Sequence, residues 1–140
     1  MATYVSNYSN SQAITVAWNS IANAAFAASS AIDNSTTKFV EIMVKVVIKT
    51  GAAGTVATGC YNIRIARSTD GGTVYQDNAS AELIGTLPAV ANATPYIGIF
   101  RCANPGSHFK IVMENLAGGT TDTTSGNHTA QFTGIKYDVA

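Results

Sequence analysis

The chain has 140 residues, the usual size of one domain, and no apolar stretch approaches the roughly 20 residues that span a bilayer. Only 11% of the residues are charged, eight acids against eight bases, where an average soluble domain has about 25%. This balance excludes the basic surface of a nucleic-acid-binding protein, and a near-neutral surface favours association with other proteins.

Residues 1–11 form a polar segment without the basic start and apolar stretch of a signal peptide, so we expect a protein that is not secreted by a signal peptide. The segment shows no clear strand pattern. Two interpretations are equally weighted: a frayed end, or an assembly arm whose Tyr4 and Tyr8 become ordered on a neighbouring subunit. Residues 12–140 are expected to form a single domain.

The next segments predict strands. Residues 12–18 resemble a strand, and residues 21–32 are rich in alanine but lack a clean helical period, which favours a strand. Residues 38–49 carry the strongest pattern, because β-branched residues at even positions, starting from Val40, predict a long strand with one buried face. The outward side chains would be Phe39, Glu41, Met43, Lys45, Val47 and Lys49.

A turn at residues 50–55 leads to a second alternating strand at residues 59–67, and these two strands are expected to pair as an antiparallel hairpin. In the final strand, the apolar parity changes at Gly134, where we expect a β-bulge. The remaining predicted strands cover residues 82–90, 96–102, 109–114 and 128–139, with a polar loop over 116–126. About eight strands without a long helix predict an all-β chain, an antiparallel β-sandwich that is jelly-roll-like.

The stretch RSTDGGTVYQD, residues 67–77, is close to the Asp-box pattern found on sialidase propeller blades. A single copy in a chain of this length excludes a propeller. Asp70 followed by two glycines is a strong hairpin signal, and its carboxylate can accept hydrogen bonds from nearby backbone N–H groups. We interpret the stretch as turn chemistry and not as a sugar-cleaving site.

Other reactive side chains show no catalytic or metal-binding spacing. His108 and His128 lie outside every zinc motif, and the acids are scattered along the chain. Cys60 is interpreted as a packing residue, and without an export signal reduced thiols are favoured for Cys60 and Cys102. We therefore expect no enzyme, no metal site and no cofactor.

Four stretches, in this order, resemble small virion structural proteins of tailed bacteriophages: KVVIKTGAAGTVATG, RSTDGGTVY, VMENLAGG and GNHTAQFTGI. The resemblance covers roughly residues 33–139. Proteins of this kind are typically β-sandwich or jelly-roll modules, and some decorate or cement capsids, often as trimers. The resemblance implies no catalytic or binding residues.

The expected function is that of a non-enzymatic virion component, a capsid decoration (cement) protein that stabilises the head by bridging capsid subunits. Its expected partners are itself, as a homotrimer, and the major capsid protein or other virion proteins, with no nucleic acid or membrane. A tail, neck or fibre-associated subunit is an alternative within the same class. A carbohydrate-binding β-sandwich is an alternative from another class, with Trp18, Tyr61, Tyr75 and Tyr96 as the candidate stacking residues.

The outward side chains of residues 38–49 give the expected subunit contact. Half of them are apolar, whereas the outer face of a sandwich in a monomer should be polar. Phe39, Met43 and Val47 would form an exposed patch that isolated domains usually avoid. We expect these three residues at or near a contact between subunits.

Overall fold

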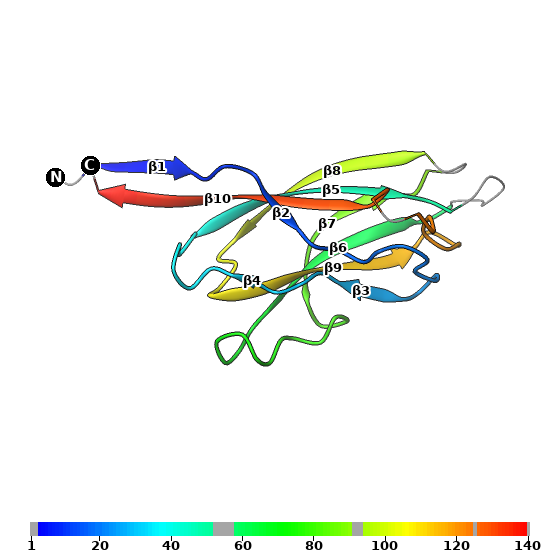
Figure 1. Ribbon diagram of the computed structural model, residues 1–140, viewed down its shortest axis with the longest axis horizontal. Helices are drawn as coiled ribbons and strands as arrows, with labels where there is room; N and C mark the ends of the chain where they lie inside the picture. Colours follow the sequence, from blue (N-terminus) through cyan, green and yellow to red (C-terminus); the bar gives the residue numbers. More distant parts are fainter. Residues whose placement is uncertain (1–2, 52–57, 91–93, 125, 140) are drawn as a thin grey trace.

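The computed structural model describes residues 3–51, 58–90, 94–124 and 126–139, which contain ten strands in two antiparallel sheets and no helix (Figure 1). The strands are β1 (Tyr4–Tyr8), β2 (Gln12–Ile14), β3 (Phe26–Ala28), β4 (Ile32–Asp33), β5 (Glu41–Lys49), β6 (Cys60–Arg67), β7 (Glu82–Pro88), β8 (Pro95–Ala103), β9 (His108–Leu116) and β10 (Thr129–Val139). The predicted antiparallel β-sandwich is confirmed.

The strand order is that of a jelly roll. In sheet A, the order is β1-β10-β5-β8, and β2 follows β1 along the same edge of β10. In sheet B, the order is β3-β9-β6-β7, and β4 lies on the same edge of β9 as β3. When β1 with β2 and β3 with β4 each count as one interrupted strand, the two sheets have the orders 1-8-3-6 and 2-7-4-5. This is the arrangement of an eight-stranded jelly roll.

The core lies between the two sheets. Along β5, Ile42, Val44, Val46 and Ile48 are buried, as their alternation predicts. Phe132 on β10 contacts the rings of Phe39 and Phe109 edge-to-face, with centroid distances of 6.3 and 5.8 Å. The other large, fully buried side chains include Trp18, Tyr61, Ile63, Ile65, Leu87, Ile111 and Met113.

The predicted hairpin between residues 38–49 and 59–67 is wrong. β5 pairs with β10 and β8 in sheet A, whereas β6 pairs with β9 and β7 in sheet B. The chain therefore crosses between sheets here, and the apolar faces of β5 and β6 meet across the core. Most of the predicted turn at residues 50–55 lies outside the described residues. Next to it, Thr50 pairs with Thr121 of the loop over residues 116–126.

Two N-terminal predictions are partly confirmed. Residues 21–32, interpreted as a strand, contain the short strand β3 and the first residue of β4, and these two strands together flank β9. The strand predicted over residues 12–18 ends at Ile14. Trp18 then donates from its indole Nε1 to the carbonyl oxygen of Ala27 at 3.1 Å, which anchors the intervening loop against sheet B.

The predicted β-bulge at Gly134 is also wrong. The register between β10 and β5 runs unbroken from Thr129 opposite Val47 to Ile135 opposite Glu41. Gly134 has another role, because a Cβ atom at this position would lie 2.3 Å from the ring of Phe39. The change of apolar parity marks the point where β10 leaves the core.

Beyond that point, β1 and the end of β10 form a two-stranded extension, here called the ribbon, made of Tyr4–Tyr8 and residues 135–139. Figure 1 shows the ribbon reaching past the other strands of the sandwich. Five residue pairs join it, from Tyr4 opposite Val139 to Tyr8 opposite Ile135. The N-terminal segment, for which no strand was predicted, thus contains a strand that pairs with its own chain.

Candidate functional site

The outer face of sheet A is the surface on which the predicted contact residues lie. Met43 and Val47 point outward from β5, opposite in parity to the buried residues of the strand. Met43 is 36% exposed and Val47 is half-buried. Their placement on an outward face is therefore as expected, while their contact with another subunit stays a prediction.

Phe39 does not belong to this surface. It is buried in the core, whereas Val40, expected in the core, is 47% exposed. The strand begins only at Glu41, so the alternation cannot be extended back through Phe39. Phe39 is removed from the predicted subunit contact.

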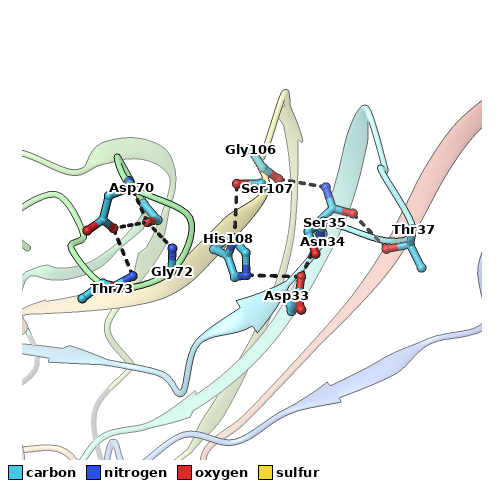
Figure 2. Close-up of polar contacts among 11 residues, drawn as sticks. Asp33, Asn34, Ser35, Thr37, Asp70, Gly72, Thr73, Gly106, Ser107 and His108 are labelled. Carbon is cyan, nitrogen blue, oxygen red and sulfur yellow. Dashed lines mark hydrogen bonds and ion pairs between the residues drawn. The ribbon is translucent and has the colours of Figure 1, made fainter.

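Asn34 explains why Phe39 turns inward. Its side-chain oxygen accepts from the N–H of Phe39 at 2.8 Å, and its side-chain nitrogen donates to the carbonyl oxygen of Phe39 at 3.0 Å. The same nitrogen donates to the carbonyl of Gly106 at 2.9 Å, and Thr37 donates to the oxygen (Figure 2). Lys38 has a φ of 53°, which reverses the chain just before Phe39. The ring then fills the space above Gly134.

Tyr4 and Tyr8, the predicted arm residues, lie on the ribbon. Register pairs share one side of a sheet, so Tyr4, Tyr8, Tyr137 and Val139 lie on the same outer face as Met43. They are 68, 63, 54 and 66% exposed, respectively. The predicted arm and the predicted contact strand thus form one continuous surface.

An ion pair lies in the middle of this surface. Arg101 on β8 donates from its guanidinium to both carboxylate oxygens of Glu41, which is 7% exposed. The hydrogen bonds and charge of Glu41 raise the pKa of Arg101 above its ordinary value. Ile135, Met43 and Tyr137 border a shallow hollow beside this pair, with a volume of about 280 Å³. The central charges are therefore neutralised within the chain.

Sequence reasoning missed Ile97 and Ile99, which extend the surface onto β8. Ile97 lies opposite Val47 and Ile99 opposite Lys45, and the two isoleucines are 57% and 66% exposed. The sequence did carry a signal for this surface, because apolar residues occupy both faces of the strand. Tyr96 and Phe100 take the inner positions, which leaves Ile97 and Ile99 on the outer face. We call Met43, Val47, Ile97 and Ile99 the aliphatic patch.

The Asp-box-like stretch folds as the predicted turn. Asp70 Oδ1 accepts from the N–H of Val74 at 2.6 Å and from the N–H of Thr73 at 3.0 Å, and these bonds lower the pKa of Asp70. Figure 2 shows the contact between Asp70 and Thr73. Ser68 Oγ accepts from the N–H of Gly72 at 2.7 Å. The side chains of Ser68 and Asp70 are thus used to fold the loop on itself.

His108 lies beside this turn in a cluster that resembles a catalytic triad. Its Nε2 is 3.3 Å from Asp33 Oδ1 and its Nδ1 is 3.3 Å from Ser107 Oγ (Figure 2). However, the serine is the preceding residue in the chain, and the Asp33 side chain is 63% exposed, whereas the orienting carboxylate of a triad is buried. The hydrogen bonds that Ser35 donates to Asp33 lower the pKa of Asp33. The cluster ties the start of β9 to β4.

His128 is buried and has a structural role. Its Nδ1 accepts from the N–H of Lys49 at 3.3 Å, and its Nε2 donates to the carbonyl oxygen of Asp122 at 3.1 Å. Burial lowers the pKa of His128, which favours the neutral ring. Lys49 and Asp122 also form an ion pair at 3.4 Å. These contacts fix the loop after β9 to the end of β5.

The candidate sugar-stacking residues do not form a platform. Trp18 and Tyr61 are each 1% exposed, and burial raises the pKa of Tyr61 to about 12. Lys110 covers the ring of Tyr75, with its Nζ 4.3 Å from the centroid. Tyr96 lies on the inner parity of β8. These four positions place no pair of open rings on one surface.

Cys60 and Cys102 carry free thiols, and no group of three or more metal-ligating side chains occurs among the described residues. In the same part of the chain, there is no helix with the length and apolar character needed to cross a membrane. No family model and no curated protein matches this sequence. The resemblance to phage structural proteins therefore stays a prediction.

Proposed function

We propose that this chain is a non-enzymatic structural subunit of a bacteriophage virion, a capsid decoration protein that bridges neighbouring capsid subunits. The observation that carries the proposal is the outer face of sheet A, where the aliphatic patch and the ribbon tyrosines form one exposed surface. Surfaces of this kind mark interaction sites on soluble proteins. A homotrimer is the stoichiometry that we propose, on the resemblance to trimeric decoration proteins.

The fold and the charge distribution support an assembly role. Double-sheet jelly rolls occur in viral capsids and also in lectins and cupins. The fold therefore agrees with the proposal but does not distinguish it from these other functions. Five of the eight acids form ion pairs with lysine or arginine inside this chain. Ion pairs formed within the chain leave few charges for a partner, which fits an interface built on apolar contact and backbone hydrogen bonds.

The test uses purified virions that carry the chain. Mass spectrometry would establish its presence, and its copy number separates the shell from the alternative position in the tail, neck or fibre, since hundreds of copies indicate the shell. Virions would then be washed in about 1 M sodium chloride, where the Debye length falls to about 3 Å and exposed ion pairs are screened. We expect the chain to stay bound. Release by moderate salt would contradict an apolar interface, and absence from virions would refute the function.

A further inference from the structure

We propose that the ribbon of one copy of this chain packs on the aliphatic patch of another copy, so that each copy gives one ribbon and receives one. The inference rests on the proposed function only in treating the outer face of sheet A as an assembly surface. It adds that the partner is a second copy, and that the ribbon of one copy meets the aliphatic patch of the other.

The first argument is the inverted polarity of the ribbon. Its inner face, which continues the core face of sheet A, carries polar groups beside Val5: Asn7 donates to Asp138 at 2.7 Å, and Lys136 lies 3.2 Å from Asp138. Its outer face carries tyrosines and a valine instead. A two-stranded ribbon is marginally stable in water unless one face packs against something. Since the inner face is mostly polar, the face available for packing is the aromatic outer one.

The second argument is area. Taking about 200 Å² for a tyrosine and about 100 Å² for an aliphatic side chain, the exposed fractions of Tyr4, Tyr8, Tyr137, Val139, Met43, Ile97 and Ile99 amount to about 600 Å². A stable interface buries about 800 Å² on each partner. The apolar part of this one face therefore supplies most of what an interface between two copies needs, and the polar surface around it supplies the rest.

The third argument is the arrangement of the face. Met43 on β5 lies opposite Thr133 on β10. From this pair, Val139 lies six residues away toward the tip of the ribbon, and Val47 lies four residues away in the opposite direction. At about 3.3 Å per residue, the ribbon and the patch thus occupy opposite ends of a surface about 33 Å long. A second copy facing the first in the reverse direction brings each ribbon onto the other copy's patch, which a partner with only one apolar element cannot do.

Charge agrees with this partner. The Glu41–Arg101 pair lies between the two halves and is neutral as a unit, so two such faces approach without net repulsion. Lys45 is the remaining cation inside the patch, and its aliphatic stem can cover apolar surface while its ammonium group reaches water or a tyrosine hydroxyl of the opposing ribbon. A single lysine does not attract a polyanion such as nucleic acid, which needs many cations.

The experiment places opposite charges on the two halves. Tyr4→Glu changes the ribbon and Ile99→Lys changes the patch, both at positions more than half exposed, so neither replacement disturbs the core. Ile99→Lys places a second ammonium group beside Lys45 with no anion to pair with, and we expect its self-association to weaken at least about tenfold. Tyr4→Glu removes a ring from the contact but faces the single cation Lys45, so we expect a smaller loss. In an equal mixture, the acidic ribbon of the Tyr4→Glu variant meets the basic patch of the Ile99→Lys variant, and the other contact joins an unchanged ribbon to an unchanged patch. We expect sedimentation velocity at low ionic strength to show that this mixture associates again.

Two controls match the variants. Val5→Lys lies on the same strand as Tyr4 but on the opposite, inner face, where its register partner is the acidic Asp138, and Leu83→Lys lies on β7 of the other sheet; both positions are exposed. We expect both controls to associate like the unchanged chain, and circular dichroism would check that all four variants fold. A Val5→Lys variant that dissociates as readily as Tyr4→Glu would overturn the assignment of the outer face.

The remaining outcomes separate this inference from the proposed function. An unchanged chain that stays monomeric at every concentration reached overturns the inference, and so does a mixture of variants that fails to associate. If that monomer still binds virions, and Ile99→Lys releases it, the face is used by another virion protein and the proposed function stands. If the chain associates as described but is absent from virions, the inference stands and the function is wrong. The reverse-direction arrangement closes as a dimer. A trimer in which each ribbon packs on the patch of the next copy around a ring would keep the contact between ribbon and patch and agree with the proposed stoichiometry, but it would overturn the reverse-direction arrangement.

Discussion

The strongest test of the fold is the contact between Phe39 and Gly134. Phe39→Ala removes a ring that is 8% exposed and packs edge-to-face on Phe132. Replacing a core phenylalanine with alanine costs about 3–5 kcal/mol. Phe39 precedes β5 at the end of the sandwich, where the surroundings can partly collapse, so we expect a cost near the lower limit, about 3 kcal/mol.

Gly134→Ala has the opposite effect on packing, because it overfills the same site. The new Cβ would lie 2.3 Å from the ring of Phe39, and the backbone of Gly134 has no positive φ that would itself oppose alanine. Overpacking of this kind costs about 1–3 kcal/mol. In the Phe39→Ala background the ring is gone, and the same replacement should then cost little. The two changes are therefore coupled, by about 1–2 kcal/mol in favour of the double variant.

Urea unfolding at one fixed protein concentration measures both effects. With a slope of about 2 kcal/mol per M, Phe39→Ala should lower the midpoint by about 1.5 M. Val40→Ala is the matched control, because Val40 is the next residue and is 47% exposed; its midpoint should move little. A loss below about 1 kcal/mol for Phe39→Ala, or strictly additive effects of the two changes, would refute the placement of Phe39 in the core.

Three further predictions concern buried and turn side chains. Asn34→Ala leaves the backbone groups of Phe39 and Gly106 without their partner in a site 4% exposed, and we expect a loss of about 2–4 kcal/mol in urea unfolding, with Thr37→Ala costing far less. His128 has a lowered pKa in the folded chain, so the stability it confers is complete above the ordinary pKa of about 6.5 and is lost as the pH falls below it; midpoints at several pH values should show this slope, and His128→Gln should remove it. Asp70→Ala should speed amide hydrogen exchange at Thr73 and Val74, whereas Asp70→Asn, which keeps an acceptor oxygen, should protect them better; equal exchange in both variants would contradict the turn role of the carboxylate.

Local patterns in the sequence predicted most of the strands and one turn. The alternation from Ile42 to Ile48 assigns the faces of β5 because a strand has a period of two and its inner face must be apolar. The turn around Asp70 was predictable because an aspartate followed by two glycines has few other uses. Both features depend on residues close together in the chain, where spacing alone determines geometry.

Pairing between strands was not predictable in the same way. Alternation gives the faces of β5 but does not say which strands lie beside it, so the nearest candidate, β6, was chosen wrongly. Phe39 was misplaced because Asn34 and the φ of Lys38 turn the chain just before the strand, and a side chain that bonds the backbone five residues later leaves no periodic signal. Ile97 and Ile99 were missed because a strand with two apolar faces looks like a buried strand.

The parity change at Gly134 connects these results to function. Up to Gly134, the apolar residues of β10 face the core, as Ala130 and Phe132 do; beyond it they face outward, as Tyr137 and Val139 do. The core needs only the first set, because the ribbon lies outside the core. The inner face of the ribbon is largely polar, and its aromatic outer face adds nothing to the core of its own chain. Exposed tyrosines and aliphatic residues gathered on one face of a nearly uncharged protein fit the proposal that this face is covered in an assembly.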